Sequence, residues 1–156
     1  MEPKTRQRLV YLAGVLVLVS VVAHLILGIL GVVDPALAGA DSRLLPIAFL
    51  IAALAALGVI WLYWSETIPH HLTFAIGFGL MVLYLLAYVD WHVFEYVESV
   101  IPLEAIGLEH DHHHHNGSPL EVLLDHLIED PFALVSKSAE AIAAIVLAVL
   151  AVLEWE

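Results

Sequence analysis

Residues 9–33, LVYLAGVLVLVSVVAHLILGILGVV, form an apolar stretch without Asp, Glu, Lys or Arg, and this stretch decides the fold class of the chain. A helix rises 1.5 Å per residue, so roughly 20 apolar residues cross the ~30 Å hydrocarbon core of a bilayer. The span must be helical because a backbone in lipid has to satisfy its own hydrogen bonds. Three further apolar stretches follow, at residues 44–64, 72–93 and 133–153. We therefore expect an all-α integral membrane protein, a bundle of four transmembrane helices in which residues 1–156 form a single domain.

The composition agrees with a bilayer environment. Hydrophobic residues make up 62% of the chain, whereas soluble domains contain about 45–50% apolar residues. Lipid must therefore solvate part of this apolar surface. Cysteine is absent from the sequence, which excludes disulfides and thiolate metal sites.

The charge is strongly negative, with 17 acidic residues against 5 basic ones and a formal net charge of −12. Nucleic-acid binding needs a basic face, so nucleic acid is not an expected partner. The acid excess lies mostly outside the apolar stretches. It suits either a salt-rich environment or the attraction of cations.

The basic residues predict the orientation. Three of the five, Lys4, Arg6 and Arg8, precede the first span, and cytoplasmic segments carry an excess of Lys and Arg. We expect a multi-pass protein of the cell membrane with both termini in the cytoplasm and with segments 34–43 and 94–132 outside. A cleaved signal peptide is the weaker interpretation of the first span, because signal sequences have apolar regions of only about 7–15 residues.

The last outer loop, residues 94–132, contains a predicted short helix. Its sequence Ser118-Pro119-Leu120-Glu121 combines an N-cap, a first-turn proline and a capping-box glutamate. Leucines then recur at helical spacing, at Leu120, Leu123, Leu124 and Leu127. This pattern predicts an amphipathic helix that lies on the membrane or over the mouth of the bundle.

The same loop carries a histidine run with one carboxylate, Asp111, inside it. Neutral imidazole is the commonest ligand for zinc, copper and nickel, and a carboxylate can complete the set. A flexible segment imposes no geometry, so we interpret the run as a capture element rather than a catalytic site. The alternative is a solvated polar linker, because a His-rich tract is only a compositional signal. The candidate ligands of this loop are His110, His112, His113, His114, His115 and, on the amphipathic helix, His126.

A second candidate site lies within the spans. A rise of 1.5 Å per residue places five ionisable groups near the outer ends of three spans: His24, His92, Glu95, Lys137 and Glu140. Ionisable groups within a membrane are costly and commonly functional. We expect a divalent cation to be bound by His24, His92 and either Glu95 or Glu140. The alternative is structural: Lys137 pairs with Glu140 at i, i+3, and His24 donates to a backbone carbonyl of another helix. If Lys137 neutralises Glu140, then His24, His92 and Glu95 remain as ligands.

Three functions from different classes are compatible with these residues. The leading hypothesis is the binding or handling of a divalent transition metal, such as zinc, copper or nickel, at the outer face. The second is a structural or accessory subunit of a larger membrane complex, or a homo-oligomer, without metal. The third is pH sensing through histidine. An enzyme is the least supported class, because the sequence has no phosphate-binding glycine loop, Gly-x-Ser-x-Gly elbow or His-Glu-x-x-His motif.

The segments Tyr88-Val89-Asp90-Trp91-His92, Ser118 to Leu127, Asp130-Pro131 and Ser136-Lys137 are similar to a family of small four-span membrane proteins of salt-loving archaea. The resemblance covers most of the chain. It implies a halophile membrane location and carries no implication for mechanism.

Overall fold

A computed structural model describes residues 2–33, 44–90 and 118–155, and within these ranges it contains helices and no strand. The helices are α1 (Pro3–Val33), α2 (Leu44–Ser65), α3 (His70–Val89), α5 (Pro119–Glu129) and α6 (Pro131–Leu153). All except α5 are long and apolar enough to cross a membrane. The expected bundle of four membrane-spanning helices with one additional short helix is confirmed.

The helix ends differ from the apolar stretches at several points. The first helix begins at Pro3 rather than residue 9, because Lys4, Arg6 and Arg8 continue the helix beyond the part that lipid can solvate. The last begins at Pro131 rather than residue 133, because the Asp130 side chain caps it by accepting from the backbone N–H groups of Phe132 and Ala133, at 2.8 and 3.2 Å. Hydropathy therefore marks the lipid-solvated part of a helix, while caps mark its end.

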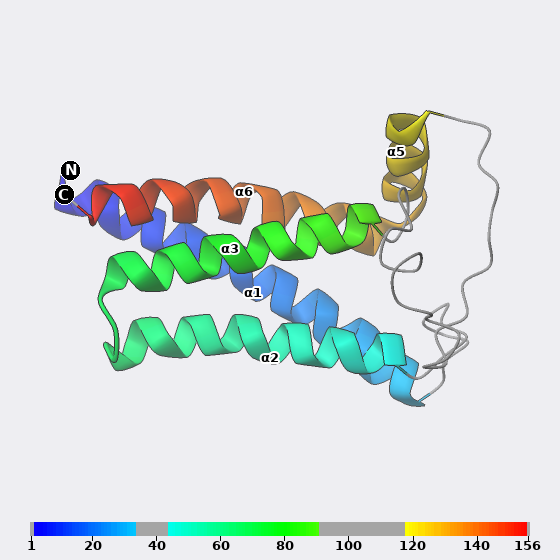
Figure 1. Ribbon diagram of the computed structural model, residues 1–156, viewed down its shortest axis with the longest axis horizontal. Coiled ribbons are helices and arrows are strands. Elements are labelled where there is room, and N and C mark those ends of the chain that lie inside the picture. The colour runs from blue at the N-terminus through cyan, green and yellow to red at the C-terminus, as the bar shows by residue number, and fades with distance from the viewer. Residues whose placement is uncertain (1, 34–43, 91–117, 156) are drawn as a thin grey trace.

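The four long helices run roughly along one direction, and α1 crosses the bundle obliquely (Figure 1). Along its length α1 packs on both α6 and α2, and α3 packs on α6. Both termini and the α2–α3 turn lie at one end of the bundle, which we call the terminal end. The short helix α5 lies at the opposite end, roughly perpendicular to the long helices, and we call this the α5 end.

Small residues allow the long helices to approach one another. The buried face of α1 includes a stripe of residues at i+3/i+4 spacing, which is typical of packed membrane helices: Ala13, Val17, Ser20, His24, Gly28 and Gly31. At Gly28 the approach to α2 is tight: an added Cβ would lie 2.7 Å from the Leu50 side chain and 3.1 Å from the Pro46 carbonyl oxygen. The opposite faces expose large apolar side chains such as Tyr11, Val15 and Val22, as a bundle surrounded by lipid requires.

Helix α5 has the capping box that its sequence predicts. The Ser118 hydroxyl accepts from the Glu121 N–H at 3.4 Å, and the Glu121 carboxylate accepts from the Ser118 N–H at 2.7 Å. Its inward face differs from the predicted leucine stripe. Val122 is buried, whereas Leu120, Leu124 and Ile128 are exposed along one side. Because α5 lies across the end of the bundle, this exposed apolar side suits the headgroup region of a bilayer.

Candidate functional site

Five polar side chains gather where α1 crosses α6, in the half of the bundle nearer α5. Ser20 and His24 lie one turn apart on α1, and Ser136 and Glu140 lie one turn apart on α6. These four are buried, with Glu140 and Ser20 both at 0% exposure. The fifth, Lys137, lies beside Glu140 on the same helix. We call these five residues the Glu140 cluster.

The Glu140 carboxylate accepts hydrogen bonds from three donors. Oε1 accepts from the Ser20 hydroxyl at 2.8 Å and from the Ser136 hydroxyl at 2.9 Å. Oε2 accepts from the Lys137 ammonium group at 2.7 Å. A buried carboxylate is tolerated when it is paired and hydrogen-bonded in this way, because these partners replace the lost hydration. The predicted Lys137–Glu140 pair is therefore present, and Ser20 and Ser136 complete it.

Lys137 has a second partner in α3. Its Nζ lies 5.4 Å from the centre of the Tyr88 ring, a distance at which a cation is attracted to an aromatic face. The lysine thus contacts the carboxylate of its own helix and an aromatic ring of the neighbouring helix. These two contacts within the bundle stabilise the positive charge of Lys137.

His24 is held in one orientation by its own helix. Its Nδ1 lies 2.9 Å from the Ser20 carbonyl oxygen, 3.3 Å from the Ser20 hydroxyl and 3.8 Å from Glu140 Oε1. Donation from Nδ1–H to the Ser20 carbonyl selects the tautomer whose Nε2 carries a lone pair. Over residues 2–33, 44–90 and 118–155, no hydrogen bond reaches Nε2. The predicted donation to a carbonyl of another helix is wrong, because the ring reaches the carbonyl one turn earlier on α1 itself.

Aromatic rings enclose the imidazole on its other sides. The Tyr84 ring centre lies 5.0 Å from that of His24, and the Phe49 ring centre lies 5.7 Å away in an edge-to-face arrangement. The Tyr84 hydroxyl donates to the Ala52 carbonyl oxygen of α2. His24 thus lies among side chains of all four long helices. Phe49 and Ser136 were missed by the sequence analysis, although Ser136 stands one turn before Glu140, as Ser20 does before His24.

The predicted metal ligands fall into two groups. His24 and Glu140 are brought together, and His126 lies on α5, where its Nδ1 is 2.9 Å from the Val122 carbonyl oxygen. The remaining candidates lie outside the described residues, namely His92, Glu95, His110, His112, His113, His114 and His115. Among the residues that are described, no three His, Asp or Glu side chains form a group that could hold a metal ion.

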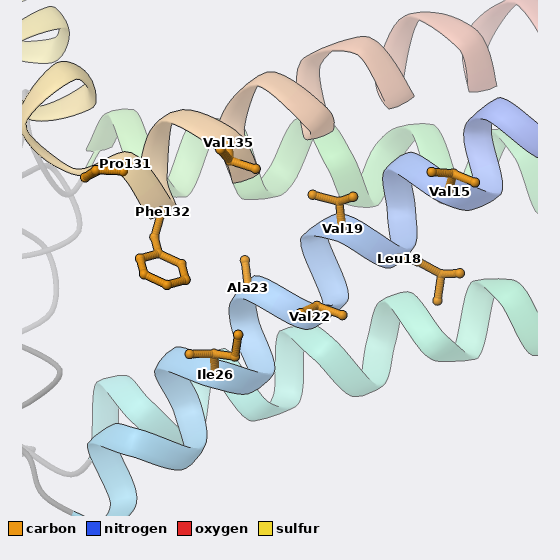
Figure 2. Close-up of a pocket in the computed structure, with 9 residues that line it drawn as sticks. All are labelled: Val15, Leu18, Val19, Val22, Ala23, Ile26, Pro131, Phe132 and Val135. Atoms are coloured by element: carbon orange, nitrogen blue, oxygen red, sulfur yellow. The ribbon is translucent and has the colours of Figure 1, made fainter.

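Next to the Glu140 cluster, an apolar pocket of about 550 Å³ opens between α1 and α6 (Figure 2). Phe132 projects from α6 into the space between the two helices, and Val22 and Ile26 lie on the α1 side. All nine lining residues are apolar: Val15, Leu18, Val19, Val22, Ala23, Ile26, Pro131, Phe132 and Val135. The pocket offers no group for a metal or a polar substrate, so the chemistry of this region lies in the Glu140 cluster.

No family model, curated protein or solved structure matches this chain. The fold and the site therefore define its class on their own. Over the described residues it is an all-helical, multi-pass membrane protein. Its buried, ion-paired polar cluster comes from α1 and α6 and contacts aromatic rings of α2 and α3.

Proposed function

We propose that this chain is a membrane protein that binds a divalent transition metal at the α5 end of the bundle, with His24 as the ligand on the membrane side. The observation that supports this is the hydrogen bond from His24 Nδ1 to the Ser20 carbonyl oxygen, at 2.9 Å. Histidines that ligate metals commonly donate their other ring N–H to a carbonyl or carboxylate, which fixes the ring and raises the basicity of the free nitrogen. Nε2 of His24 is left available in this way.

The contacts of Glu140 assign it a different role from ligation. Its two oxygens already accept from Ser20, Ser136 and Lys137, so a metal would have to displace those donors. We therefore assign Glu140 to holding α1 against α6 and to neutralising Lys137. Neutralisation matters because an unpaired ammonium group in the same layer would repel a bound cation.

The other ligands are expected from the segment between α3 and α5. His92 and Glu95 follow α3, and the histidine run at 110–115 offers further imidazoles. These nitrogen and oxygen donors, without any thiolate, suit zinc, copper or nickel. In this proposal the run captures the ion and His24 holds it at the membrane.

Competition between the protein and a chromophoric zinc chelator, in detergent, tests the proposal. We expect His24→Gln, which keeps an amide able to bond the Ser20 carbonyl, to weaken zinc binding by about 10- to 100-fold or more. Replacing His112, His113, His114 and His115 together with Ser separates capture by the run from binding in the bundle. His71→Gln, at the terminal end, is the matched control and should bind as the wild type does. Equal zinc affinity in wild type and His24→Gln, with intact helicity, would contradict the assignment of His24.

A second candidate function is a structural or accessory subunit of a larger membrane complex. The hydrogen bonds that Glu140 accepts from three donors on two helices favour this function. Such a network holds helices together without any ligand. This alternative predicts co-purification with a larger complex after mild solubilisation from the native membrane. It also predicts that zinc affinity stays the same when the histidine run is replaced.

We further propose that the terminal end faces the cytoplasm of a cell with a salt-rich surrounding. Three of the five basic residues, Lys4, Arg6 and Arg8, lie at that end, and the acid excess of the chain suits salt. The absence of cysteine allows a clean test with single-cysteine variants and a membrane-impermeant maleimide. Ser118→Cys should be labelled in intact cells and Glu2→Cys only after lysis. The reverse pattern would contradict this orientation.

A further inference from the structure

A cleft at the terminal end lies between the parts of α1 and α2 that diverge there. Because α1 crosses the bundle obliquely, its first turns lie away from α2 (Figure 1). The cleft has a volume of about 680 Å³, and residues of all four long helices line it. Val10, Ala13 and Leu18 of α1 form part of its apolar wall, and Leu147 of α6 and Phe74 of α3 close its inner side. This cleft is separate from the Glu140 cluster.

One polar group in the cleft wall lacks a partner. Thr73 is 1% exposed, and its hydroxyl oxygen forms no hydrogen bond with any described part of the chain. The Pro69 carbonyl, one turn earlier, accepts from the backbone N–H of Thr73 instead. A buried hydroxyl without a partner costs about 1–3 kcal/mol. A hydrogen-bonding atom of a ligand in the cleft would satisfy this hydroxyl.

The mouth of the cleft is polar, with one basic side chain in its lining and two more on the adjoining turns. Arg6 and Gln7 line it on α1, and Tyr63 and Trp64 line it on α2. The Arg6 guanidinium pairs with Glu154 through Nε and Nη2, and Tyr63 beside it also interacts with the guanidinium. Lys4 and Arg8 are exposed on the same turns of α1. Aromatic side chains and cations at this depth are typical of the headgroup level of a bilayer.

From the mouth inward, the cleft thus presents basic groups, then a single hydroxyl, then an apolar wall. An anionic membrane lipid has the same order: a phosphate headgroup, oxygen atoms at the backbone and an apolar chain. We propose that the cleft binds one anionic lipid, whose chain lies between α1 and α2, whose backbone oxygen accepts from Thr73, and whose phosphate lies near Arg6 and Lys4. A detergent or a neutral isoprenoid would satisfy only part of this pattern.

Two substitutions fill or alter the cleft with little effect on packing elsewhere. Gly14 lines the cleft, and a Cβ added there meets no atom within 4 Å, so Gly14→Leu occupies the space intended for the chain. Gly79 on α3 is the matched control, because it is equally open but lies in a different groove. Thr73→Val removes the hydroxyl and keeps the shape. Thr5→Val, at an exposed position, is its control.

The experiment is native mass spectrometry of the full chain in detergent with added dioleoyl phosphatidylglycerol, in the presence of a metal chelator. Because no metal is needed, failure here leaves the metal proposal untouched. We expect one retained lipid per wild-type chain, at least about 10-fold less retention by Gly14→Leu, and about 2- to 10-fold less by Thr73→Val. Gly79→Leu and Thr5→Val should retain lipid as the wild type does.

Two results would overturn the proposal. One is equal retention of phosphatidylglycerol by wild type and Gly14→Leu. The other is Gly14-dependent binding of a short-chain ubiquinone without binding of phosphatidylglycerol, which would assign the cleft to a neutral quinone. Phosphatidylcholine serves as the comparison for charge, and equal retention of both lipids would contradict the role of Arg6 and Lys4.

Discussion

The Ser20 hydroxyl on α1 donates a hydrogen bond of 2.8 Å to Glu140 Oε1 on α6, between residues 120 positions apart in the chain. This bond fixes the depth at which the first and last spans cross. It also places His24, one turn after Ser20, within 3.8 Å of the same carboxylate oxygen. The crossing of α1 and α6 therefore organises the candidate site.

Replacement of Glu140 tests the stability that the cluster contributes. Glu140→Ala leaves the partly buried Lys137 ammonium group without its carboxylate. We expect a loss of about 3–5 kcal/mol in the free energy of unfolding. Glu140→Leu combined with Lys137→Met removes both charges and should recover most of that loss. Unfolding of the protein in mixed micelles by increasing SDS measures both. If Glu140→Ala were as stable as the wild type, the cluster would not be buried as described.

The close approach of α1 to α2 gives a second prediction. In Gly28→Ala the new methyl group would lie 2.7 Å from the Leu50 side chain and 3.1 Å from the Pro46 carbonyl oxygen, so Leu50 must shift or the two helices must separate. Overpacking of this kind costs about 1–3 kcal/mol, measured by the same SDS titration. Gly58→Ala is the control, because no atom lies within 4 Å of a Cβ at that position. Equal effects of the two substitutions would contradict the tight contact.

The ion pair between Arg6 and Glu154 predicts a dependence of stability on pH. The side-chain hydrogen bond from Arg6 lowers the pKa of Glu154 below its ordinary value of 4.5. A carboxyl group with a lowered pKa stabilises the folded state above its unfolded pKa, and this contribution is lost as the pH falls from about 4.5 through the folded pKa. Because Arg6 and Glu154 are partly exposed, we expect no more than about 1 kcal/mol, weakened further by salt. Glu154→Gln should remove this acid part of the pH profile, below about pH 4.5, and an unchanged profile would contradict the pair.

The capping box of α5 gives a local prediction. Ser118→Ala removes the acceptor for the Glu121 N–H, which costs about 1 kcal/mol of helix stability. Because α5 packs against α6 through few residues, the effect should stay within residues 119–129. Hydrogen exchange followed by mass spectrometry should show faster exchange there and unchanged exchange in α6. Faster exchange throughout the bundle would contradict the view that α5 is a peripheral helix.

The features that follow from local sequence could be predicted. Residues 9–33 had to be a spanning helix because of their length and apolarity. The capping box at Ser118 and the Lys137–Glu140 pair are relations within three residues, so helical geometry alone determines them.

The features that depend on helix crossing could not be predicted. Nothing local indicates that Ser20 meets Glu140, or that Arg6 reaches Glu154. These contacts depend on the angle at which α1 crosses its neighbours, and small residues such as Gly28 set that angle through packing on α2. The same crossing opens the cleft beside Thr73. A depth count along each helix placed His24 and Glu140 in one layer, but it did not show that three donors would occupy the carboxylate.

The most direct test of the metal proposal is elemental analysis of the purified, untagged chain after incubation with zinc, copper and nickel and removal of free metal. The account predicts about one bound ion per wild-type chain and a marked loss in His24→Gln, with retention in His71→Gln. A wild-type chain that carries no metal under these conditions would contradict the proposal. The interpretation of the Glu140 cluster as a structural network of a membrane subunit would then stand in its place.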